Sequence, residues 1–105
     1  MEGQNENLNN EQIQNFLQEI KNEQHPMEDD ETLIGYINDG IYDINEISGE
    51  HINYEVDRVA KSLLKNYVFY ARYKRLAEFK QLYGGEYAYL QAKYYKPSSV
   101  SWWIF

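Results

Sequence analysis

The feature that most constrains the fold of this chain is a run of apolar residues at helical spacing in its second half. From residue 56 to residue 71, apolar side chains recur three or four positions apart without exception. They are Val56, Val59, Ala60, Leu63, Leu64, Tyr67, Val68 and Ala71. This period places the side chains on one face of an α-helix, whereas a strand alternates its side chains between two faces. The run therefore predicts an amphipathic helix whose apolar face is buried.

Signals on either side predict the limits of this helix. Asn53 is the expected N-cap, with Glu55 and Asp57 in the first turn, where acidic side chains are favourable. The apolar pattern slips across residues 72–75, and the glycine pair after Tyr83 breaks it. Between these points it resumes at Leu76, Phe79, Leu82 and Tyr83. If the helix continues to Tyr83, it is about 44 Å long. We expect part of such a helix to project beyond the core or to pack against a neighbour.

Three shorter segments also show a helical pattern. The first, residues 11–24, ends at His25 because the proline that follows disfavours helical backbone there. The second begins with the acidic run at residues 28–31 and ends at Gly49. The third covers residues 86–96 and ends before another proline. Their apolar faces are formed by Ile13, Phe16, Leu17 and Ile20, by Leu33, Ile37, Ile41 and Ile44, and by Tyr87, Leu90 and Tyr94.

Two glycines, Gly35 and Gly40, lie inside the second of these segments. Each costs about 1 kcal/mol relative to alanine in a helix interior. We expect them where another helix comes close, although a kink would also explain them.

These patterns predict one all-α domain, a small bundle of about four helices with one long member. A chain of 105 residues has room for a single modest core, and a hydrophobic content of 43% is ordinary for a globular protein. Residues 1–10 are expected to form a flexible arm, residues 11–96 the helical domain, and residues 97–105 an extended C-terminal tail.

Charge is divided unevenly along the chain. Residues 1–53 contain 13 acids and a single basic residue, Lys21, whereas residues 54–105 contain 9 basic residues and 4 acids. The two halves can attract one another within the fold, attract the opposite halves of neighbouring copies, or present an acidic face to a partner.

Tyrosine is also unusually frequent. The chain has 11 tyrosines, 9 of them from Tyr54 onward. Tyrosine is favoured where one protein surface meets another, because its ring supplies contact area while its hydroxyl stays hydrated or bonded. Stacking on bases is a weaker alternative, since single-strand binders pair aromatic rings with a positive groove.

Residues that would carry catalysis are missing or isolated. The chain has no cysteine, and His25 and His51 are single histidines in predicted loops. The acids at residues 28–31 lack the spacing and the glycine of a calcium loop. Gly84 and Gly85 are not followed by the lysine and hydroxyl residue of a phosphate-binding loop. We therefore expect no enzyme, no bound metal and no cofactor.

Membrane insertion and specific DNA recognition are not expected either. No apolar run approaches the roughly 18 residues that span a bilayer, and the N-terminus has no signal-peptide pattern. Arg72, Lys74, Arg75 and Lys80 form one basic patch, which is less positive charge than specific DNA readers carry. An intracellular or particle-bound protein is the natural interpretation.

The order and punctuation of the helices resemble those of the head–tail connector, or adaptor, proteins of tailed bacteriophages. The resemblance begins at DDETLIGYINDGIYDINEISG, where an acidic cap leads an isoleucine-rich helix closed by a glycine. It continues in YEVDRVAKSLLKNYVFYARYKRLAEFKQLYGGEYAYLQAKY, where an aspartate precedes a Leu-Leu pair and Phe79 lies four residues before Tyr83. It covers residues 28–95 and is one of pattern rather than of an invariant signature. The segment 11–24 and the SWWIF ending lie outside it.

This resemblance implies a structural virion protein without chemistry of its own. Members of the family assemble into a homo-oligomeric ring, usually a dodecamer, beneath the portal protein at the capsid vertex. The ring extends the DNA channel and offers a docking surface to a stopper or tail-completion protein. The implied location is the virion, after synthesis in the host cytoplasm, with only non-specific proximity to packaged DNA.

The implied role assigns three groups of candidate residues. The acids Glu28, Asp29, Asp30 and Glu31 are candidates to face the channel, where negative charge would let DNA slide without adhering. Candidates for contacts between subunits are Tyr70, Arg72, Tyr73, Lys74 and Arg75. Candidates for docking on the portal are Val100, Trp102, Trp103, Ile104 and Phe105.

The aromatic C-terminus suits such an arm energetically only when it is repeated. Burying three large aromatic side chains gains about 15 kcal/mol gross. Ordering eight residues costs about 1–2 kcal/mol each, so the two nearly cancel for one tail. A ring of tails sums many small surpluses. The alternative is that Trp102 and Trp103 cover the protein's own core.

A different class of function is also compatible with the charge division. A small acidic protein that mimics DNA would occupy a basic site on a host protein. The aromatic-rich basic half argues against this alternative, because a mimic requires a uniformly acidic surface.

Overall fold

The computed structural model describes residues 10–96, and that part of the chain forms five helices and no strand. They are α1 (Asn10–Gln24), α2 (Asp30–Ser48), α3 (Arg58–Arg72), α4 (Leu76–Leu82) and α5 (Gly84–Lys93). The all-α prediction is confirmed. The predicted tail lies outside the described residues, and so does the predicted arm except for Asn10, which begins α1.

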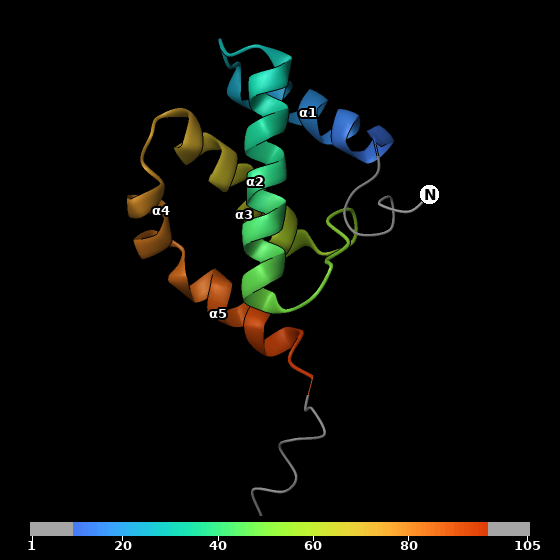
Figure 1. The fold of residues 1–105 in the computed structure, drawn as a ribbon, viewed down its shortest axis with the longest axis vertical. Helices are drawn as coiled ribbons and strands as arrows, with labels where there is room; N and C mark the ends of the chain where they lie inside the picture. Colours follow the sequence, from blue (N-terminus) through green and yellow to red (C-terminus); the bar gives the residue numbers. More distant parts are fainter. Residues whose placement is uncertain (1–9, 97–105) are drawn as a thin grey trace, which may run out of the picture.

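The core is built on α2 and α3, which pack face to face, with α2 through the centre of Figure 1 and α3 behind it. Leu33, Ile37, Ile41 and Ile44 of α2 are fully buried, as expected from their spacing. They meet the predicted apolar face of α3, in which Ala60, Leu63, Leu64, Tyr67, Val68 and Ala71 are buried.

The two glycines of α2 have different surroundings. A Cβ added to Gly40 would lie 2.6 Å from Cδ1 of Leu64 and 2.9 Å from Cδ1 of Tyr67, so close helix approach explains this glycine. A Cβ added to Gly35 would meet nothing within 4 Å. The expectation of a close helix is thus confirmed at Gly40 only.

The short helix α1 lies against one end of α2. Phe16, Leu17 and Ile20 are buried there. The helix ends at Gln24, and His25, which follows it, has a left-handed φ of 49° and precedes the proline that prevents continuation.

The predicted start of α3 is wrong by four residues. Its N-cap is Asp57, whose carboxylate accepts a hydrogen bond from the N–H of Ala60 at 3.0 Å. Asn53 instead accepts from the N–H of Glu55 at 3.0 Å and stabilises the turn before the helix. Val56 belongs to this turn and is 74% exposed, although its spacing had placed it on the apolar face.

The single long helix is also a wrong prediction, because the chain turns sharply between α3 and α4. Lys74 has a left-handed φ of 59°. Its N–H donates to the carbonyl of Ala71 at 3.1 Å, and the N–H of Arg75 donates to that of Tyr70 at 2.9 Å. This pair of bonds is a Schellman motif, which ends a helix by satisfying its last carbonyls.

The consequence is that α4 folds back on the bundle instead of projecting from it. Phe79 is fully buried, whereas Leu82, expected on the same apolar face, is 59% exposed. The expected break is present, since α4 ends at Leu82 and α5 begins at Gly84, but the two glycines belong to the first turn of α5 instead of separating the helices. Residues 10–96 therefore form five helices, close to the expected number of about four, and the longest of them is α2.

Helix α5 is held against α2 and α3 by carboxylates as well as by buried Tyr87 and Leu90. The Tyr87 hydroxyl donates to Asp43 of α2 at 2.7 Å. At the start of α3, Asp57 accepts from the Tyr94 hydroxyl at 2.5 Å and from Lys93 at 3.0 Å. Burial alone would raise the pKa of Asp57, but these bonds and that from the Ala60 N–H hold it below its usual value. Burial and the bond to Asp57 raise the pKa of Tyr94 to about 12.

The last helix ends at Lys93, three residues earlier than expected.

Candidate protein-binding surface

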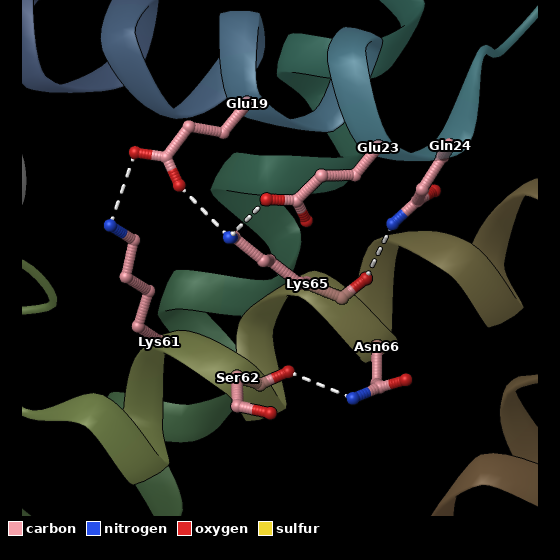
Figure 2. Close-up of polar contacts among 7 residues, drawn as sticks. All are labelled: Glu19, Glu23, Gln24, Lys61, Ser62, Lys65 and Asn66. Carbon is pink, nitrogen blue, oxygen red and sulfur yellow. Dashed lines mark hydrogen bonds and ion pairs between the residues drawn. The ribbon is translucent and has the colours of Figure 1, made fainter.

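Five acids of the first half form ion pairs with lysines or an arginine of the second half: Glu19, Glu23, Glu28, Asp43 and Glu50. Figure 2 shows the densest part, where Nζ of Lys65 lies 2.9 Å from carboxylate oxygens of both Glu19 and Glu23. Lys61 pairs with the other oxygen of Glu19 at 3.1 Å, and the Gln24 side chain donates to the carbonyl of Lys65 at 3.0 Å. The hydrogen bond from Lys65 is the main cause that holds the pKa of Glu19 below its usual value.

Arg72 also belongs to this contact region. Its side chain is enclosed by the protein and is not free on the surface to contact a neighbouring subunit. Its side chain is only 6% exposed. It donates to Glu28 at 3.0 Å and to the side-chain oxygen of Gln24 at 3.1 Å, beneath the ring of Tyr73. Burial would raise the pKa of Glu28, but the bond from Arg72 contributes to holding it below its usual value. We call this region the α1–α3 seam. It comprises Glu19, Glu23, Gln24, Glu28, Lys61, Lys65 and Arg72.

The four acids expected to face a channel have different surroundings. Glu28 belongs to the seam. Asp29 is the N-cap of α2, accepting from the N–H of Thr32 at 2.8 Å, and Asp30 pairs with Lys21 at 3.0 Å. Glu31 is exposed and has no hydrogen bond or ion pair with the described residues. Three of the four therefore have a structural partner, and their role toward DNA stays a prediction.

The turn between α3 and α4 presents the opposite situation, with aromatic and cationic side chains facing outward. The ring of Phe69 lies 5.0 Å from that of Tyr73 and 5.5 Å from that of Tyr70, measured between centroids. The ring of buried Phe79 supports Tyr70 from below at 5.7 Å. Tyr73 is 54% exposed. Together these rings form a continuous aromatic layer that runs from the core to the surface.

Two hollows flank this turn. One of about 280 Å³ is lined by Phe69, Tyr70, Tyr73, Arg75 and Glu78. The other, of about 400 Å³, is lined by Tyr36, Asp39, Tyr67, Ala71, Lys74, Leu76 and Ala77. The side chain of Arg75 forms an ion pair with Glu78, whereas the side chain of Lys74 makes no hydrogen bond or ion pair within residues 10–96. We call the surface formed by Phe69, Tyr70, Tyr73, Lys74, Arg75 and Glu78 the α3–α4 corner.

Four of the five residues predicted to contact neighbouring subunits meet at this corner. Tyr70, Tyr73 and Arg75 line one hollow and Lys74 lines the other, whereas Arg72 points into the seam. Sequence reasoning missed Phe69 and Glu78. The signals were present, since Phe69 is four residues before Tyr73, and Glu78 is three after Arg75. The docking candidates Val100, Trp102, Trp103, Ile104 and Phe105 lie outside the described residues.

The remaining candidates for chemistry do not assemble. In the range 10–96, no three His, Asp or Glu side chains lie close enough to hold a metal ion. His25 and His51 are both exposed and far apart in the chain. None of the five helices is long and apolar enough to cross a membrane.

No protein-family model, curated protein or solved structure that was compared with the chain matches it.

Proposed function

We propose that this protein is a structural subunit of a bacteriophage virion, a head–tail connector that forms a ring beneath the portal. In this role the ring extends the DNA channel and receives a stopper or tail-completion protein. The proposal starts from the resemblance over residues 28–95, whose helices correspond to α2 through α5.

The observation that carries the proposal is the α3–α4 corner. It combines an exposed tyrosine, a supported aromatic layer and an unpaired lysine. Tyrosine and arginine are enriched in surfaces that bind proteins, and aromatic rings that are fixed from below lose little entropy on binding. Such a corner suits a protein that acts by contact with other proteins.

The alternative of an acidic DNA mimic draws no support from the charges. Glu19, Glu23, Glu28, Asp43 and Glu50 each pair with a cation of the second half. A mimic would need those carboxylates free to meet the basic site of a host protein. We therefore propose the connector alone.

The test is binding of the full-length protein to the purified portal of the same phage, imaged by electron microscopy. We expect a ring on the portal with the full chain and none after deletion of residues 98–105. The deletion should leave helicity and melting temperature nearly unchanged, because those residues are expected to act as an arm. A large fall in melting temperature would show that the tail belongs to the core, and failure of the intact chain to bind would overturn the connector proposal.

A further inference from the structure

The junction between α4 and α5 is a single residue, Tyr83, and the two helices meet there at an angle in Figure 1. Its φ of −108° and ψ of 20° differ from ordinary helical values by about 45° and about 60°. Its N–H donates to the carbonyl of Phe79 at 2.9 Å, and its carbonyl accepts from the N–H of Tyr87 at 3.2 Å. Both bonds have the four-residue spacing of an α-helix. A modest rotation at Tyr83 would therefore join α4 and α5 into one straight helix.

Two glycines follow this residue without a packing reason. A Cβ added to Gly84 or Gly85 would meet nothing within 4 Å, in contrast to Gly40. Both lie in the first turn of α5, whose N–H groups have no acceptor inside that helix. In a straight helix these N–H groups would donate to carbonyls of α4, but glycine is less stable than alanine in a helix interior. The glycines therefore act against the straight form, and replacing them would favour it.

Helix α5 is held to the rest of the molecule largely by directional bonds. Its buried residues are Tyr87 and Leu90. Carboxylates of α2 and at the start of α3 accept from tyrosine and lysine side chains of its second half, and Nζ of Lys96 lies 2.7 Å from a carboxylate oxygen of Glu50. Asp57 is 4% exposed and would lose two of its donors if α5 moved away. Because a buried carboxylate without its donors is costly, the vacated surface requires another α5.

We propose that copies of this protein exchange α5. In this arrangement α4 and α5 of one copy straighten at Tyr83, and α5 occupies the surface of α2 and α3 in the next copy. The fit needs no new complementarity, because every contact of the exchanged helix is one that the chain also makes within itself. Each copy gives one helix and receives one, so the exchange repeats head to tail until a ring closes. The closure into a ring rests on the proposed function.

Cross-linking between differently marked copies tests the exchange, because the chain has no cysteine of its own. One full-length preparation carries Glu50→Cys and a second carries Lys96→Cys, and the two are incubated together at millimolar concentration before a short bis-maleimide is added. In the control mixture Lys74→Cys replaces Lys96→Cys, since both lysines are exposed. We expect at least about tenfold more mixed cross-linked product from the first mixture, as a specific contact requires. Equal yields from the two mixtures would overturn the exchange.

Replacement of the two glycines provides a second test in the same cysteine pair. Gly84→Ala with Gly85→Ala should raise the yield of mixed product about fivefold, because alanine favours the straight helix and neither Cβ meets a neighbour in the folded-back form. The matched control is Gly35→Ala, which also adds a Cβ to an open position of a helix and should leave the yield unchanged. A yield that does not rise with the double replacement would rule out straightening at Tyr83.

The two proposals fail in different ways. A chain that carries both Glu50→Cys and Lys96→Cys distinguishes them when rings have formed on the portal. Cross-links confined to single copies in such rings would overturn the exchange and leave the connector function standing. Cross-links between copies of the free protein, without any binding to the portal, would support the exchange and overturn the connector function.

Discussion

The α1–α3 seam and the α3–α4 corner use the same helix and the same kinds of residue for opposite purposes. In the seam, lysines and an arginine of α3 each face carboxylates of the first half at hydrogen-bonding distance. At the corner, two residues further along, Lys74 is exposed and unmatched within the described part of the chain. Charge asymmetry along a sequence is therefore not by itself evidence of a binding surface. Only the charged side chains that remain unpaired in the folded chain are available to a partner.

The largest expected effect concerns the support beneath the corner. Phe79→Ala should lower the free energy of unfolding by about 3–5 kcal/mol, because a fully buried ring that contacts Tyr67, Tyr70, Tyr83 and Tyr87 is lost. Urea denaturation followed by circular dichroism measures it. The matched control in the same helix is Leu82→Ala, which should cost well below about 1 kcal/mol because the side chain is mostly exposed. Similar losses for both variants would contradict the arrangement of α4.

The next largest effect comes from comparing a cation of the seam, Arg72, with a cation of the corner, Lys74. Arg72→Met should cost about 2–3 kcal/mol, because its nearly buried guanidinium bonds both Glu28 and Gln24. Lys74→Met should change stability by no more than about 0.5 kcal/mol, because nothing in the described chain pairs with it. The two denaturation midpoints give the comparison. Equal costs would show that the corner lysine is as structural as the seam arginine.

The two glycines of α2 allow a similar comparison, because Gly40 faces closely packed side chains and Gly35 faces open space. Gly40→Ala should destabilise by about 1–2 kcal/mol, since its Cβ would overlap Leu64 and Tyr67. Gly35→Ala should stabilise the protein by about 0.5–1 kcal/mol through helix propensity, because its Cβ would meet nothing within 4 Å. Thermal melting of the two variants gives the comparison. A loss of stability in Gly35→Ala would mean that this glycine has a structural role within the chain.

The smallest expected effect is the pH dependence of the seam. The pKa values of Glu19 and Glu28 are lowered from 4.5 in the folded protein, so the unfolded chain binds their protons more readily. Their contribution is present above about pH 4.5 and is lost as pH falls further. Glu19→Gln should therefore flatten the fall in stability at acid pH, whereas Glu46→Gln, which removes no ion pair, should not. Denaturation midpoints measured across this pH range check the prediction. If both variants behaved like the parent protein, the ion pairs of the seam would not contribute to stability as proposed.

Local patterns were a good guide wherever a single helix decided the outcome. The limits of α1 and α2, the buried face of α2 and the burial of Leu63, Leu64 and Val68 were all predictable from apolar spacing and capping residues. Four of the six corner residues were predicted as a group, because aromatic and basic side chains are adjacent in the chain. Arg72 was wrongly grouped with them, since spacing along a helix does not tell which neighbour lies across from it.

The predictions failed where competing signals had similar strength. A lysine in left-handed backbone ends α3, although glycine is the usual residue at that position. Conversely, the break after α4 occurs where it was expected, but the two adjacent glycines are the first residues of α5 instead of a linker before it. At Lys74 the combined burial of Phe79, Tyr87 and Leu90 outweighs the local preference, because each contributes about 1.5–3 kcal/mol whereas one left-handed residue costs about 1–3 kcal/mol.

The sequence by itself determined the helical class of this protein, the apolar faces of its helices and the separation of its charges into two halves. Hydrophobic period and capping act over a few residues, and their signals can be seen in a single segment. The tertiary structure alone decided which charges neutralise one another, which glycine is enclosed, and which aromatic and cationic side chains remain outside. Those outcomes depend on contacts between residues about forty positions apart, such as Glu19 with Lys61 and Glu28 with Arg72, which no local pattern encodes.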